Sequence, residues 1–78
     1  PVEILAINLP DSVKGEIIVL LLEGDLDPED VRRAINASPI PPLMKPKEIL
    51  KVDEIPKLGT GKSDFNKAKK IAAELRGG

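Results

Sequence analysis

Hydrophobic residues dominate two neighbouring segments near the start of the chain, residues 2–9 and residues 16–22. Short, nearly continuous apolar runs of this kind predict β-strands that are covered on both faces. A buried helix is the alternative for residues 16–22, but that run is short and ends at Glu23 and Gly24. Turn-forming residues occupy positions 10–15, and parallel pairing would need a long crossover, so we expect an antiparallel hairpin.

Helical spacing begins after this hairpin. Asp27 is a good N-cap and Pro28 suits the first helical position, so a helix is predicted to begin there. It should end at Ser38, because the residue before Pro39 is disfavoured in a helical conformation. Its apolar residues share one face, and they are Val31, Ala34 and Ile35.

A second amphipathic helix is predicted from about Asp64 to Leu75, with Ser63 or Asp64 as its N-cap. Its apolar stripe consists of Phe65, Ala68, Ile71, Ala72 and Leu75. We expect both helices to bury their stripes on the sheet.

Two further segments connect these helices. Residues 38–47 contain four prolines and predict a stiff, non-helical connection. Residues 48–52 predict a third strand with Leu50 and Val52 pointing inward. The predicted order is strand, strand, helix, strand, glycine loop, helix. The predicted fold class is α+β, with a small, mainly antiparallel three-stranded sheet and two packed helices.

Composition narrows the function classes. The chain has 78 residues, a formal charge of −1, one aromatic residue and neither cysteine nor histidine. These numbers fit one small domain and exclude disulfides, catalytic cysteines and imidazole bases. Few aromatics and little net charge argue against a nucleic-acid partner. The longest apolar run is too short to span a membrane. The chain begins without methionine, and we expect it to be a piece of a longer protein.

The candidate chemistry lies in the loop before the last helix, where Gly59, Thr60, Gly61 and Lys62 follow one another. Glycines allow backbone amides to turn toward a ligand, and a lysine supplies a charge on a long stem. A plain turn between a strand and a helix is the structural alternative. A nucleotide P-loop is disfavoured because that motif requires glycine at position 56, which is proline here.

Two stretches resemble the adenylate-forming enzymes, which include acyl-CoA and acyl-acyl-carrier-protein synthetases, luciferases and peptide-synthetase adenylation domains. Residues 55–62 resemble the last motif of that family, and residues 9–16 look like a turn in its small C-terminal domain. The likeness covers most of the chain. It is greatest to the bacterial acyl-acyl-carrier-protein synthetase fused to 2-acylglycerophosphoethanolamine acyltransferase. It implies that residues 1–78 are part of the small C-terminal domain, without the hinge and the large N-terminal domain.

The resemblance also implies a reaction. An acid and ATP form an acyl adenylate, and the acyl group then passes to coenzyme A or to the phosphopantetheine of an acyl-carrier protein. By motif position Lys62 is the catalytic lysine, and Gly59, Thr60 and Gly61 lie at the nucleotide. ATP with Mg would be bound mainly by the N-terminal adenylation domain, the first partner, so the fragment should be inactive alone. The resemblance implies a cytoplasmic protein, with the inner face of the bacterial membrane as an alternative location of the full-length protein.

Two other hypotheses remain open from the residues. One is a free-standing anion-binding or regulatory module that uses the lysine loop. The other is an interaction domain whose basic last helix meets an acidic carrier protein or a membrane surface. The basic residues of that helix region are Lys67, Lys69, Lys70 and Arg76.

Overall fold

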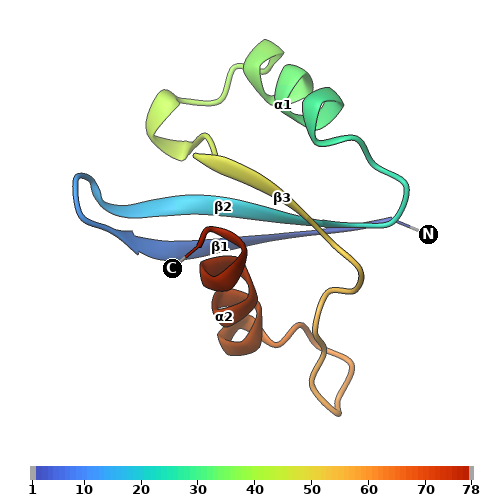
Figure 1. Cartoon of the computed structure of the whole chain (residues 1–78). Helices are drawn as coiled ribbons and strands as arrows, with labels where there is room; N and C mark the ends of the chain where they lie inside the picture. Colours follow the sequence, from blue (N-terminus) through green and yellow to red (C-terminus); the bar gives the residue numbers. More distant parts are fainter. Residues whose placement is uncertain (1, 78) are drawn as a thin grey trace.

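A sheet of three strands in the order β1-β2-β3 forms the centre of the protein (Figure 1). The structure is a computed structural model, and it describes residues 2–77. The strands are β1 (Glu3–Asp11), β2 (Gly15–Glu23) and β3 (Glu48–Val52). The helices are α1 (Pro28–Ala37), the short 3₁₀ helix η1 (Pro42–Met44) and α2 (Phe65–Leu75). The predicted α+β fold and the order of strands and α-helices are confirmed, but the connection predicted to be non-helical contains the 3₁₀ helix η1.

The sheet is mixed. β1 and β2 pair antiparallel over nine residue pairs, whereas β3 pairs parallel with β2 over five. The antiparallel hairpin is therefore the larger part of the ladder, as predicted. β3 can run parallel because residues 24–47, which include α1 and η1, form a crossover that is long enough to return the chain to the same end of the sheet.

The β1–β2 turn is tighter than the sequence predicted. Pro10 and Asp11 continue β1, and the turn itself contains residues 12–14. Pro10 is tolerated because β1 is an edge strand. The Asp11 carboxylate accepts hydrogen bonds from the backbone N–H groups of Lys14 at 2.8 Å and Val13 at 3.1 Å. The bond from Lys14 is the main reason that the pKa of Asp11 lies below its ordinary value.

One face of the sheet carries the main core. Alternate residues of β1 and β2 are buried there, opposite one another in the register, because successive side chains of a strand point to opposite faces. Ala68 and Ala72 of α2 are fully buried against this face, and Leu50 and Val52 of β3 pack at its edge as predicted. The strand residues of this cluster are Leu5, Ile7, Leu9, Ile17, Val19 and Leu21.

The other face of the sheet is not covered at β1. Ile4, Ala6 and Asn8 are exposed there, so the prediction that this strand is covered on both faces was wrong.

The predicted stripe of α2 is only partly buried. Phe65 and Leu75 keep 51% and 53% of their surface exposed, so the expectation that they pack on the sheet was wrong. They are the first and last residues of the helix, whereas Ala68 and Ala72 lie in its middle, where α2 meets the core cluster. The N-cap of α2 is Asp64, which accepts from the N–H of Lys67 at 3.1 Å.

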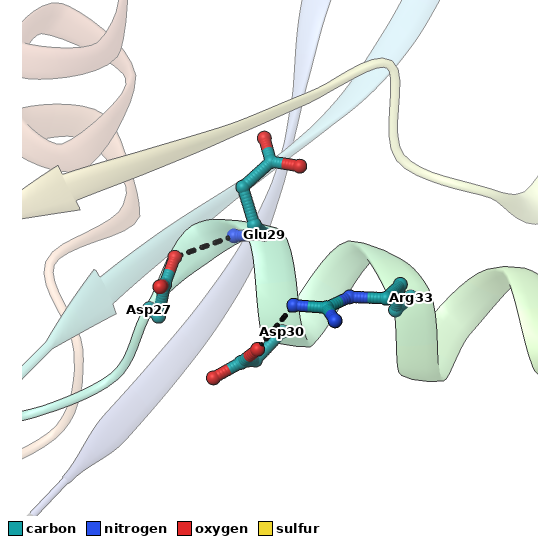
Figure 2. A network of polar contacts seen from close by, with 4 residues as sticks. All are labelled: Asp27, Glu29, Asp30 and Arg33. Atoms are coloured by element: carbon teal, nitrogen blue, oxygen red, sulfur yellow. Dashed lines mark hydrogen bonds and ion pairs between the residues drawn. The ribbon is translucent and has the colours of Figure 1, made fainter.

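α1 lies next to β3, and α2 lies next to β1, with the strands between them (Figure 1). The predicted cap of α1 is confirmed, since Asp27 accepts from the N–H of Glu29 at 2.9 Å. Figure 2 shows this cap together with an Asp30–Arg33 ion pair of 2.5 Å on the exposed side of the helix. No residue of α1 is fully buried, and its apolar stripe is therefore only partly covered.

Candidate functional site

The four predicted site residues lie together at the tip of the loop between β3 and α2. Gly59, Thr60, Gly61 and Lys62 are all exposed. The loop closes as a small hairpin, because the N–H of Leu58 donates to the Lys62 carbonyl at 2.7 Å. The side chain of Lys62 forms no ion pair within residues 2–77, so its charge is available to another molecule.

The two glycines of the loop have different roles. Gly61 has a φ of +90° and donates its N–H to the Leu58 carbonyl at 2.9 Å. A three-residue hairpin loop requires such a left-handed residue after its turn, so Gly61 shapes the tip. Gly59 has no positive φ, and a side chain there would meet nothing within 4 Å. The fold of this chain therefore gives no reason for glycine at position 59.

Two glutamates anchor the base of the loop to the sheet. Glu3 and Glu23 face each other at the open end of the β1–β2 hairpin. The Glu23 carboxylate accepts the N–H of Ile55 at 2.6 Å, and Ile55 itself is fully buried. The Glu3 carboxylate pairs with the Lys57 ammonium. Like charges opposite each other in a ladder repel, and these two contacts offset that repulsion while they fix where the loop leaves the sheet.

The anchor distinguishes the two lysines of the loop. Lys57 is held at the base by its ion pair with Glu3 and by an isolated bridge to Ser63. Lys62 lies at the exposed tip without such a partner among the described residues. Of the two, Lys62 has the geometry of a group that acts on another molecule, whereas Lys57 has that of a structural residue.

The site is a projecting loop and not a cleft. Two surface hollows of the protein are lined by other residues, one beside the β1–β2 turn and one between the end of β3 and α2. Residues 2–77 contain no group of three or more acidic side chains that could hold a metal ion. No described helix has the length and apolar character needed to cross a bilayer. A ligand at Lys62 would need a second surface to enclose it.

Comparison with solved structures shows which proteins contain a segment of similar fold. A Mycobacterium tuberculosis fatty acyl CoA synthetase matches 94% of the chain with a TM-score of 0.82 and 21% identity. The amide bond synthetase McbA from Marinactinospora thermotolerans matches 90% with a TM-score of 0.74 and 25% identity. An acyl-CoA synthetase (AMP-forming)/AMP-acid ligase II-like protein from Dyadobacter fermentans matches 91% with a TM-score of 0.71 and 22% identity.

The chain has the fold of a short segment of these proteins. It spans 15% of the length of the first two and 21% of the third. No family model matches the chain. The resemblance to adenylate-forming enzymes is thus supported by fold, and no particular subfamily is singled out by these structures.

The anchor residues Glu3, Glu23 and Lys57 were not predicted as part of the site. Their contacts join positions 54 and 32 residues apart, beyond any local pattern. One signal could have found them. A hairpin that turns at residues 12–14 places Glu3 opposite Glu23, and two facing carboxylates require a donor nearby.

Replacing Glu23 with alanine should lower the free energy of unfolding by about 1–3 kcal/mol, because the half-buried N–H of Ile55 loses its acceptor. Urea denaturation measures this loss. Glu3→Ala is the matched control, and its effect should stay below about 1 kcal/mol because the Glu3–Lys57 pair is solvent-exposed. Equal losses in the two variants would contradict a specific role for the Glu23–Ile55 bond.

Proposed function

We propose that this chain is the mobile C-terminal lid of an ATP-dependent acyl ligase, in which Lys62 is delivered to the reacting groups during formation of an acyl adenylate. The observation that supports this proposal most directly is an exposed, unpaired lysine on a loop that is anchored only at its base. The solved structures with the same fold are synthetases in which the matching segment is a small part of the chain.

The proposed chemistry explains why a lysine is needed. A carboxylate oxygen attacks the α-phosphorus of ATP, the acyl–phosphate bond forms, and the bond to pyrophosphate breaks. Negative charge must be held on both partners and on the leaving pyrophosphate. An ammonium group brought in on a closing lid stabilises this charge where it develops, in a site from which water is excluded.

The presence of glycine at position 59 also supports the proposal. The backbone conformation at this position does not require glycine, and nothing within the chain crowds it. Absence of a side chain is useful where a backbone must approach another molecule closely. We therefore assign Gly59 and Thr60 to the surface that faces the nucleotide, while Gly61 holds the tip in shape.

The remaining groups of the reaction belong to the proposed large N-terminal domain. That domain would bind the acid and most of the ATP, and it would hold Mg, for which residues 2–77 offer no cluster of ligands. Mg would neutralise phosphate charge there. The acyl group would then pass to a thiol, either of coenzyme A or of the phosphopantetheine on an acyl-carrier protein. We place the full-length protein in the cytoplasm.

Acetylation of Lys62 provides one test of this function. Acetylation removes the charge but leaves the stem, so ATP–pyrophosphate exchange by the full-length protein should fall by about 10² or more. The enzyme is acetylated at position 62 alone by incorporation of acetyl-lysine, and exchange is measured with labelled pyrophosphate. Deacetylation should restore the rate. Full exchange activity of the acetylated protein would contradict the assignment.

A further inference from the structure

A basic groove lies at the end of the sheet opposite the lysine loop. It has a volume of about 600 Å³ and lies between the start of β2 and the proline-rich segment before β3. Its floor is apolar, with Ile17, Ile18 and Pro46 among the lining residues. Its four cationic side chains come from three separate segments, and they are Lys14, Arg32, Lys45 and Lys47.

Within residues 2–77 the lysines of the groove form no ion pair, although Lys47 interacts electrostatically with the carboxylate of Asp11. Arg32 donates to the Lys47 carbonyl at 3.2 Å, which positions the guanidinium without balancing its charge. Glu16 is the single acid in the lining, and a protein of net charge −1 therefore has a local surplus of positive charge here. Such a surface attracts acidic partners from a distance.

The rim of the groove exposes large apolar side chains. Leu43 is 95% exposed and lines the groove, and its neighbour Met44 is 63% exposed. Val13, next to Lys14 in the β1–β2 turn, is 88% exposed. Exposed apolar residues surrounded by charged ones are the usual anatomy of a protein–protein contact. The rim is also stiff, because η1 begins with Pro42 and is flanked by Pro41 and Pro46, and stiffness lowers the entropic cost of docking.

The groove and the lysine loop can act on different molecules. Glu16, near the start of β2, lines the groove, whereas Glu23, at the end of β2, holds the loop base. Along β2, Glu16 and Glu23 are about 24 Å apart. In Figure 1 the β1–β2 turn and η1 lie at one end of the strands, and the loop before α2 lies at the other. The groove is therefore not part of the Lys62 site.

We propose that this groove docks an acidic protein surface that inserts an apolar side chain between the lysines. The occupant we commit to is an acyl-carrier protein, and only this identity rests on the proposed acyl transfer. Charge complementarity would steer the encounter, and the apolar contact would hold the complex. An anionic membrane is the less suitable partner because its surface is flat, whereas the contact here is hollow and includes Glu16.

Binding of an apo acyl-carrier protein to the full-length protein tests the docking site without any need for catalysis. Lys14→Glu combined with Lys45→Glu should raise the Kd by about tenfold or more, because both rim charges are reversed. Leu43→Ser should raise the Kd by a similar factor while the salt dependence stays as in the wild type. The double variant should show a weaker salt dependence than the wild type between about 50 and 200 mM salt.

The matched control is Lys69→Glu combined with Lys70→Glu, the same change of net charge on exposed positions of α2. Its effect on the Kd should stay below about threefold, since it acts only through the long-range field. A control as damaging as the groove variant would overturn the site. The proposal would also be overturned if the wild-type protein showed no detectable binding to the carrier protein. It would equally be overturned if the wild-type protein bound only to vesicles with about 30% phosphatidylglycerol, through the groove lysines. If the wild-type protein bound the carrier protein but did not catalyse ATP–pyrophosphate exchange, the proposed function alone would be contradicted.

Discussion

Replacement of Lys62 by alanine in the full-length protein should slow ATP–pyrophosphate exchange by about 10² to 10³, the usual effect of removing one preorganised charge-stabilising donor. Transfer of the acyl group from a supplied acyl adenylate to the thiol should be nearly unchanged. We expect this division because negative charge accumulates on the phosphates in the first step, whereas under the proposed function the lid would have turned Lys62 away in the second. The two half-reactions are measured separately on the same preparation.

Lys57→Ala is the matched control for this experiment. It removes an equal charge from the same loop, but Lys57 lies at the base and is paired with Glu3. Its exchange rate should therefore fall much less than that of Lys62→Ala. Equal losses in both half-reactions for Lys62→Ala would indicate a folding or general binding role. A larger exchange defect at Lys57 would mean that Lys57 is the catalytic lysine.

Leu21→Ala should lower the free energy of unfolding by about 2–5 kcal/mol. Leu21 is fully buried in β2, the central strand, with Leu5 and Leu50 beside it on the neighbouring strands. Truncation would leave a cavity where the core is contributed by all three strands. Because a domain of this size has little stability in reserve, the variant should be largely unfolded near its working temperature. Urea denaturation followed by far-ultraviolet circular dichroism measures the change.

Leu43→Ala removes the same atoms from a side chain that is 95% exposed, and it is the control for Leu21. Its effect on stability should stay within about 0.5 kcal/mol. A loss of similar size in both variants would mean that the exposed position is covered in solution. That result would contradict the exposure described for Leu43 and would indicate that the rim of the groove makes contacts in solution.

Local chemistry made much of the fold predictable. Asp27 and Asp64 cap the two helices because a carboxylate can accept from the free N–H groups of a first turn, and this depends only on neighbouring residues. The two nearly continuous apolar runs and the turn-forming residues between them likewise predicted the hairpin. The direction of β3 relative to β2 could not be predicted in this way. It depends on how residues 24–47 return across the sheet, and the prolines of that segment indicate stiffness without indicating direction.

The candidate site was predictable to a similar degree. The loop tip was found because glycine and lysine at close spacing have a direct physical meaning. The groove was not found, since Lys14, Arg32 and Lys45 come from separate segments and converge only when β3 adds to β2. The burial of α2 was overestimated because helical periodicity reports which residues share a face, and not how far the sheet beneath them extends.

The placement of the anchored loop and the groove at opposite ends of β2 has a kinetic consequence. The groove residue Glu16 and the loop anchor Glu23 lie about 24 Å apart along β2, so an acceptor docked on the groove would leave Lys62 free to work. The acceptor would then be bound to the groove before the adenylate has formed. Because both surfaces are attached to one sheet, the turn that withdraws Lys62 would carry the waiting acceptor with it. A single motion would end the first half-reaction and deliver the reactant of the second.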